Sequence, residues 1–252
     1  MKHLKKIISM VLILTAFGCM KVEDQSTAAG TVSFTLSTED NVADQTKSAV
    51  SNYTSLPTVD DFVIEIAPVS VSTTFTWRGQ IGDWDPSTMV PAGSYKVTAT
   101  YGSLEEEGFD KPFFTGETNF TITAQTGDAI QPVNVSIEVS LGNTVVLVRC
   151  TDNFKNYYND YTFKLSRDGS DIVDFVKDET KAAFIDAYKF KLEGSIMKGD
   201  KSISFDKEYT NLDVATAYTI LFDVANVGGT AITISFNDTV ETVELGDLEL
   251  NE

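Results

Sequence analysis

Histidine is almost absent from this chain. Its 252 residues include one histidine, His3, which lies close to the N-terminus. Ser-His-Asp and Cys-His catalysis both need an imidazole as the general base, and histidine is the commonest metal ligand in proteins. Because no histidine follows residue 3, most hydrolytic and redox mechanisms lack the side chain that they need. We therefore expect a protein that is not an enzyme, with no cofactor and no metal site.

Cysteine is nearly as scarce, with Cys19 and Cys150 alone. If Cys19 carries a lipid, as its surroundings suggest below, then Cys150 has no partner and no disulfide framework can form. Cys150 ends the run NTVVLVRC, in which Val146, Val148 and Cys150 share one face of an alternating strand. This pattern favours a small buried side chain, and the alternative is a reactive thiol.

Basic residues are also few. The chain has 19 lysines and arginines against 37 aspartates and glutamates, which gives a formal net charge of −18. A surface this acidic repels the phosphates of nucleic acid and of anionic lipid headgroups, so we expect no nucleic-acid partner. Solubility alone is a sufficient reason for such a charge.

One apolar run stands out, and it lies at the N-terminus. In MKHLKKIISMVLILTAFG, three lysines precede an apolar stretch that is too short to span a bilayer, which is typical of a secretory signal. The small residues before Cys19 resemble a lipobox. We therefore predict a signal peptide over residues 1–18, a lipid on Cys19 and a polar tether over 19–29. The expected location is the outer membrane, with the protein exposed at the cell surface.

From Gly30 onward the chain consists of short alternating runs separated by turn residues, such as GTVSFTLST and QPVNVSIEVS. Such runs predict an all-β protein. A break at SLGN, residues 140–143, divides them into two sets of comparable length. We expect two tandem antiparallel β-sandwich domains, immunoglobulin-like or transthyretin-like, over residues 30–141 and 142–252. The stretch TDNFKNYYNDY suits one helical turn or a tyrosine-rich loop.

The stretch VPAGSYKVTATYG, residues 90–102, predicts a turn that leads into a strand. Tyr95, Val97, Ala99 and Tyr101 fall on one face of that strand, so we expect the ring of Tyr95 to lie in the core of the first sandwich. In the second half, Asp168 and Gly169 are typical of a hairpin turn.

Four segments resemble one known family: VPAGSYKVTATYG, EEEGFDKPFFTGETNFTITA, VLVRCTDNFKNYYNDYTFKLS and FVKDETKAAFIDAYKF. The family is that of the Bacteroidetes surface lipoproteins with domain of unknown function 4493 (DUF4493). The loop GFDKPFFTG, residues 108–116, is the most specific of the shared elements. The family has no assigned activity, so the resemblance implies a location and an architecture. A looser similarity links the chain to fimbrillins, the two-domain adhesive subunits of pili.

Aromatic residues form the candidate binding site. Trp77 and Trp84 flank a glycine-containing connection, and the loop after it contributes Phe109, Phe113 and Phe114. Exposed rings beside aspartate and arginine would stack against the sugar rings of a glycan. Alternatively, the same rings cover the open ends of a sandwich. Exposure of Trp77 and Trp84 on one ridge would favour glycan binding, and burial would favour an adhesive or scaffolding role.

Two function classes remain open. The first is a non-enzymatic surface lipoprotein, attached to the membrane by its lipid, that adheres to an extracellular protein or glycan or builds a surface assembly. The second is a glycan-binding lipoprotein of a polysaccharide uptake system. A carboxylate-based glycosidase is a remote third alternative, because two acidic side chains about 5 to 9 Å apart are all that it needs. With 37 acidic residues in the chain, no pair can be singled out.

Overall fold

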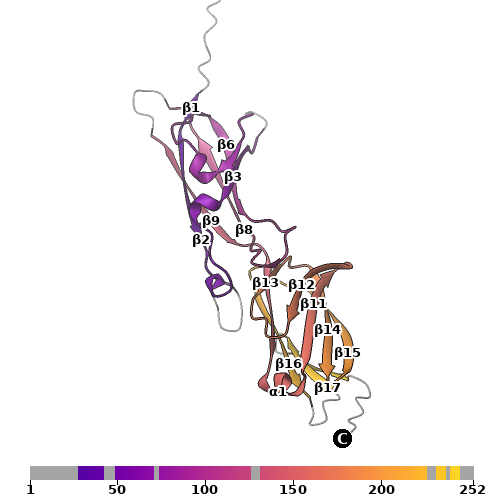
Figure 1. The fold of residues 1–252 in the computed structure, drawn as a ribbon. Coiled ribbons are helices and arrows are strands. Elements are labelled where there is room, and N and C mark those ends of the chain that lie inside the picture. Colours follow the sequence, from indigo (N-terminus) through magenta and orange to yellow (C-terminus); the bar gives the residue numbers. More distant parts are fainter. Residues whose placement is uncertain are drawn as a thin grey trace, which may run out of the picture.

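The computed structural model describes residues 28–42, 49–70, 74–125, 131–225, 231–236 and 239–244, the side chains of the last segment excepted. These residues form mainly β-strands, which build two lobes placed end to end in an elongated body (Figure 1). None of the helices in this part of the chain is long and apolar enough to cross a membrane. The predicted signal peptide, Cys19 and most of the tether lie outside the described residues.

The first lobe contains eight strands and three short 3-10 helices. The six strands of its main sheet follow the order β2-β9-β8-β6-β3-β4, and β1 pairs with β5 in a small separate ribbon. The strands are β1 (Ala29–Gly30), β2 (Val32–Thr38), β3 (Val63–Pro68), β4 (Trp77–Gln80), β5 (Val90–Pro91), β6 (Gly93–Tyr101), β8 (Phe114–Ile122) and β9 (Val133–Leu141). The 3-10 helices are η1 (Val50–Asn52), η2 (Val59–Asp61) and η3 (Ile81–Asp83).

Strand β9 divides the first lobe into two layers. Its residues Val133–Val139 pair with β2, whereas only Ser140 and Leu141 pair with β8. The β2–β9 pair can therefore fold over the other four strands, and the apolar faces of both layers share one core. The ring of Phe34 on β2 lies 5.8 Å from that of Phe120 on β8, which shows the contact between the layers.

The second lobe is a sandwich of a six-stranded sheet, ordered β18-β17-β16-β10-β13-β7, and a four-stranded sheet, ordered β12-β11-β14-β15. The stacked rings of Phe163 and Phe222, 4.1 Å apart, join the two layers. The elements are β7 (Gly108–Phe109), β10 (Thr144–Cys150), α1 (Asp152–Tyr157), β11 (Asp160–Arg167), β12 (Ser170–Val176), β13 (Ala183–Ile185), β14 (Lys189–Lys198), β15 (Lys201–Thr210), β16 (Ala217–Val224), β17 (Ala231–Phe236) and β18 (Thr239–Glu244).

The all-β prediction is confirmed, with one correction. Most neighbouring strands run antiparallel as expected, but β2 runs parallel to β9, and β10 runs parallel to β16. Side chains alternate between the two faces of a strand in either arrangement, so the sequence pattern carries no information about direction. Each parallel pair joins strands that are distant in the sequence, as parallel pairing requires a crossover connection.

Local elements match their sequence patterns. The sequence left a helical turn or a tyrosine-rich loop open for TDNFKNYYNDY, and residues Asp152–Tyr157 form a short helix. The hydroxyl of Thr151 caps this helix by accepting a hydrogen bond from the backbone N–H of Phe154 at 3.2 Å. Asp168 and Gly169 join β11 to β12 with φ angles of 48° and 84°, as a tight hairpin requires.

The expected core position of Tyr95 is confirmed. Tyr95 is fully buried on β6, and its ring stacks on that of Phe120 with the ring centroids 5.6 Å apart. The phenolic hydroxyl donates a hydrogen bond to the carbonyl oxygen of Pro91 at 2.8 Å. The tyrosine therefore ties the strand back to the turn from which it starts.

The two lobes share core residues across their junction. Strand β10 is buried on both faces: Val145 and Leu147 pack into the core of the first lobe, while Val146 and Val148 pack into that of the second. Only residues 142–143 separate it from β9. In addition, β7 leaves the first half of the chain to join a sheet of the second lobe. The break expected at residues 140–143 is therefore a packed junction.

Candidate functional site

The two tryptophans of the predicted aromatic site lie together, but they differ in exposure. Their ring centroids are 5.1 Å apart in an edge-to-face arrangement. Trp84 is only 8% exposed, and its indole Nε1 donates a hydrogen bond to the carbonyl oxygen of Val32 at 3.0 Å. Trp77 is half-buried on β4. The pair therefore belongs to the core of the first lobe, with only Trp77 reaching solvent.

The three phenylalanines of the predicted site lie at the junction between the lobes. Phe114 is fully buried and faces Phe62 at 6.4 Å. Phe109 is half-buried, and its ring meets Phe175 of the second lobe edge-on at 5.0 Å. Phe113 is half-buried beside Gly142, where an added Cβ would lie 2.6 Å from the phenylalanine ring. These positions match the alternative in which the rings cover the ends of a sandwich.

The loop between β6 and β8, residues 102–113, is called the clasp below, because it reaches from the first lobe to the second. Within it, β7 pairs with β13, so that Phe109 lies opposite Ala183 and Gly108 opposite Phe184. Gly102 begins the clasp with a φ of +73°, and an added Cβ there would lie 2.3 Å from the carbonyl oxygen of Pro112. The most specific motif of the sequence therefore overlaps a structural connection between the lobes.

A mostly buried ion pair anchors the clasp. A carboxylate oxygen of Glu107 lies 2.8 Å from Nη1 of Arg167, and both side chains are 16% exposed. The same oxygen accepts a hydrogen bond from the backbone N–H of Asp186 at 2.7 Å. The other nitrogens of the guanidinium, Nε and Nη2, donate to the carbonyl oxygens of Lys189 and Asp186. Each charge is thus paired and hydrogen-bonded, as burial requires.

A buried asparagine holds the other end of the clasp. Asn143 is 1% exposed, and its side-chain amide donates to the carbonyl oxygen of Lys111 at 3.1 Å and accepts from the backbone N–H of Phe113 at 3.2 Å. Its own carbonyl oxygen accepts from the backbone N–H of Ala215. One residue of the junction therefore binds segments of both halves of the chain.

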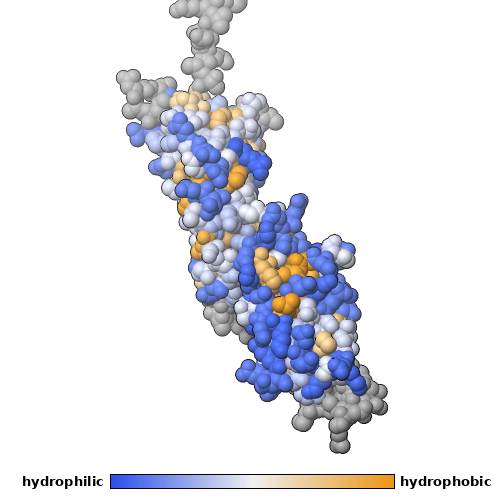
Figure 2. Space-filling model, in the orientation of Figure 1, coloured by the Kyte–Doolittle hydropathy of each residue, from blue (hydrophilic) through white to orange (hydrophobic). Residues whose placement is uncertain are grey.

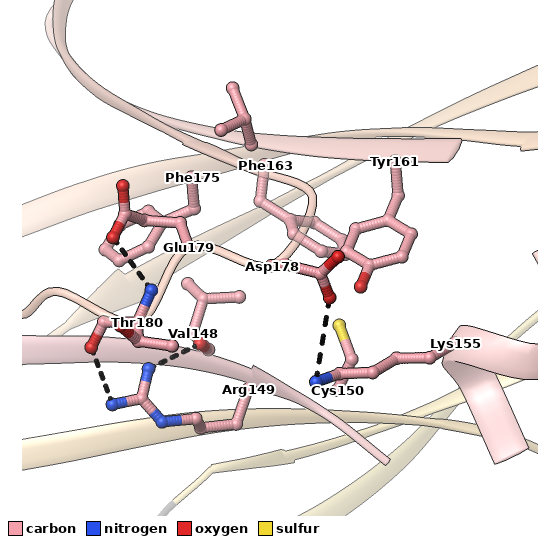
Figure 3. Close-up of a pocket in the computed structure, with 11 residues that line it drawn as sticks. Val148, Arg149, Cys150, Lys155, Tyr161, Phe163, Phe175, Asp178, Glu179 and Thr180 are labelled. Atoms are coloured by element: carbon pink, nitrogen blue, oxygen red, sulfur yellow. Dashed lines mark hydrogen bonds and ion pairs between the residues drawn. The ribbon is translucent and has the colours of Figure 1, made fainter. Parts of the chain in front are cut away.

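The second lobe contains a small pocket around Cys150 (Figure 3). Its volume is about 40 Å³, enough for one or two water molecules. The thiol lies between Lys155 and Tyr161, and Lys155 forms an ion pair with Asp178 at 3.8 Å. Burial raises the pKa of the Cys150 thiol to about 12, which keeps it protonated at neutral pH. Cys150 is half-buried against the core of the second lobe, so it is less buried than its strand pattern predicted.

We expect Cys150 to react slowly with a thiol reagent in the folded protein. The thiolate is the reacting species, and raising the pKa from 9.0 to about 12 lowers its population about a thousandfold near pH 8. Iodoacetamide labelling followed by mass spectrometry measures the rate, with the urea-unfolded chain as the reference. The Cys19→Ala variant leaves Cys150 as the only thiol. Equal rates in folded and unfolded protein would contradict this expectation.

Sequence reasoning missed the residues that join the lobes. Glu107, Arg167 and Asn143 carry no local pattern, because their roles depend on contacts between segments far apart in the chain. Within the described ranges, no group of three or more histidine, cysteine, aspartate or glutamate side chains is placed to hold a metal ion.

Comparison with solved structures finds matches at low sequence identity and with TM-scores below 0.5. A proposed cell adhesion protein from Bacteroides ovatus shares 12% identity at a TM-score of 0.46, over 86% of this chain and 100% of that chain. A proposed adhesin from Bacteroides thetaiotaomicron shares 12% identity at a TM-score of 0.45, over 87% of this chain and 98% of that chain. A proposed polysaccharide-binding protein (DUF1812) from the same species shares 12% identity at a TM-score of 0.45, over 85% of this chain and 98% of that chain.

Comparison with protein families finds one model that matches most of the chain. Residues 28–247 match the family described as domain of unknown function DUF4493. No curated protein matches the chain.

Proposed function

The chain belongs to the DUF4493 family, and we propose that it is a cell-surface lipoprotein that acts without catalysis, as an adhesion or surface-assembly module. In this proposal the signal peptide over residues 1–18 is removed, and a lipid on Cys19 attaches the protein to the outer membrane. The domains over residues 30–141 and 142–252 then work as one unit that carries a binding surface away from the membrane.

The order of the lobes along the body supports this arrangement. Strand β1 lies at the end of the first lobe that is remote from the second lobe, and α1 and β17 lie at the opposite end of the molecule (Figure 1). Eight residues separate Cys19 from the first described residue, and an extended chain of that length spans at most about 30 Å. A lipid on Cys19 would therefore keep the first lobe close to the membrane and direct the second lobe outward.

The joint between the lobes is the observation that carries the proposal. Domains linked by a flexible segment move relative to each other unless their interface is large and apolar. Here β10 contributes side chains to both cores, and the clasp adds the ion pair between Glu107 and Arg167. A body stiffened in this way presents the second lobe at a fixed distance and orientation, which suits adhesion or assembly.

Replacement of Cys19 by alanine tests the anchor. In a Bacteroidetes host, we expect the wild-type chain in the membrane fraction and open to added protease on intact cells, and the Cys19→Ala chain in the soluble fraction. Attachment of intact cells to host-cell monolayers and to one another tests the role, and we expect it to fall in the variant strain. A Cys19→Ala chain that stays in the membrane would refute the anchor. Equal attachment by cells with and without the displayed chain would refute the adhesive role.

A further inference from the structure

The outer face of the four-stranded sheet in the second lobe carries a groove that the functions considered so far do not use. Its volume is about 390 Å³. The strands that form it lie at the front of the second lobe in Figure 1, and the same lobe in Figure 2 is covered mainly by hydrophilic residues around a small apolar patch. The lining residues include Arg167, Asp168, Asp171, Lys189, Lys191, Glu193 and Glu208.

Charges of opposite sign are interleaved in this groove. Its lining contains three basic and four acidic side chains, although the chain as a whole is strongly acidic. Lys189 forms an ion pair with Asp168 at 2.8 Å, and Lys191 forms ion pairs with Glu193 at 3.1 Å and with Asp206 at 3.5 Å. The groove therefore presents hydrogen-bond donors and acceptors side by side, with little net charge to attract an anion or a cation.

A strongly exposed aromatic side chain lies next to Lys189, one of the residues that line this groove. Among the described residues, Tyr188 has the highest exposed fraction of that class, 68%. The ammonium group of Lys189 lies 5.6 Å from the centre of its ring, and the same group forms the ion pair with Asp168 inside the groove. An exposed aromatic ring therefore stands next to a row of polar groups.

Two lining residues of the groove, Arg167 and Lys191, are held by contacts within the protein. Arg167 belongs to its lining and is held by Glu107 of the clasp and by two backbone carbonyl groups. Lys191 lies on β14, where it is directly opposite Glu208 of β15 and Ser166 of β11. Side chains held on strands and by ion pairs lose less conformational entropy on binding, which favours recognition of a weakly interacting ligand.

We propose that this groove binds a neutral polysaccharide, with Tyr188 as the ring on which a sugar stacks. Sugar hydroxyls donate to carboxylates and accept from ammonium groups, so they match an interleaved set of both. The apolar face of a sugar ring packs on an exposed tyrosine, whose hydroxyl stays in water. This inference rests on the proposed adhesive function, since it names the ligand that the outward lobe would hold.

Binding by the full chain in detergent micelles tests the proposal. The probes are neutral polysaccharides (glucans, mannans and galactans), with a polyuronate for comparison, and isothermal titration measures the affinity. We expect at least one neutral polymer to bind and the polyuronate to bind more weakly. Tyr188→Ala is expected to weaken binding about tenfold, and Tyr188→Phe, which keeps the ring, is expected to weaken it less. The exposure of Tyr188 leaves the fold intact in both variants.

A matched pair of lysines provides the control. Lys191 and Lys96 are both on strands, in ion pairs with glutamate, with 43% and 45% of the side chain exposed. Lys191→Met, which removes a donor from the groove, is expected to weaken binding about tenfold, and Lys96→Met, on the first lobe, is expected to leave it unchanged. The proposal is wrong if no neutral polymer binds, or if Tyr188→Ala and Lys191→Met bind as the wild type does.

The two proposals fail in different ways. If cell attachment depends on the chain and the Tyr188→Ala variant supports it as well as the wild type does, the adhesive function stands. The polysaccharide groove is then rejected as the adhesive site. The opposite outcome would be a purified chain that binds a neutral polymer through Tyr188, together with cells that attach equally well with and without the chain. That outcome would support the groove and reject the adhesive function.

Discussion

Replacing Tyr95 by alanine is expected to lower the free energy of unfolding by about 3 to 5 kcal/mol, which is the usual cost of truncating a large buried aromatic residue. The ring is fully buried between Phe120 and Phe75, whose centroids lie 5.6 and 6.1 Å away. The variant also loses the hydrogen bond from the tyrosine hydroxyl to Pro91. A loss of this size is a large share of the roughly 5 to 15 kcal/mol that stabilise a typical domain. Urea unfolding followed by tryptophan fluorescence measures it.

Tyr95→Phe separates the two contributions. It keeps the ring and removes only the hydroxyl, so the expected loss is about 0.5 to 1.5 kcal/mol. Neither variant should change binding at the groove of the second lobe beyond the effect of unfolding. A Tyr95→Ala protein that unfolds at the wild-type urea concentration would show that the ring is not part of the core.

Arg167→Met is expected to destabilise the protein by about 3 kcal/mol, because it leaves the carboxylate of Glu107 mostly buried and without its ion-pair partner. The double variant Glu107→Gln/Arg167→Met removes both charges and should recover part of this loss, since an unpaired buried charge costs more than a missing pair. The double-mutant cycle, measured by urea unfolding, gives the coupling energy of the pair.

The exposed ion pair between Lys96 and Glu117 is the control for this cycle. Its atoms are 3.0 Å apart, but both side chains are about half exposed or more, so solvent screens their interaction. Lys96→Met is expected to leave the urea midpoint within experimental error. If Arg167→Met had an equally small effect, the ion pair between Glu107 and Arg167 would not contribute to the stability of the junction.

The strands of this protein are visible in its sequence because their faces differ in polarity. Tyr95, Val97 and Ala99 alternate with polar residues, and all three are buried as that pattern predicts. Strand β10 is different, because its run of valines and leucine is buried on both faces. An unbroken apolar run of this kind indicates a strand covered on two sides, but it does not say which two cores it separates.

The contacts between segments were beyond the reach of sequence patterns. Glu107 is one of 37 acidic residues, and only the folded chain brings it to Arg167. Trp77 and Trp84 are only seven residues apart in the sequence, yet one reaches solvent and the other donates a hydrogen bond to Val32 in the core. Tyr188 lies in the shared segment FVKDETKAAFIDAYKF, but its role as a candidate ligand platform depends on its exposure and on its contact with Lys189 of the groove.

The strand that both lobes share also determines how the molecule would respond to mechanical force. If the protein were anchored through its N-terminus and its second lobe held a ligand, tension would pass through the clasp and from β9 through residues 142–143 into β10. That strand starts at the junction and leads toward α1 at the far end of the second lobe, so the pull would act along its length (Figure 1). It pairs in parallel with β16 from Val145 to Cys150 and antiparallel with β13 from Thr144 to Val146. A load applied along a strand paired on both sides is shared among its hydrogen bonds, which makes this joint resistant to shear.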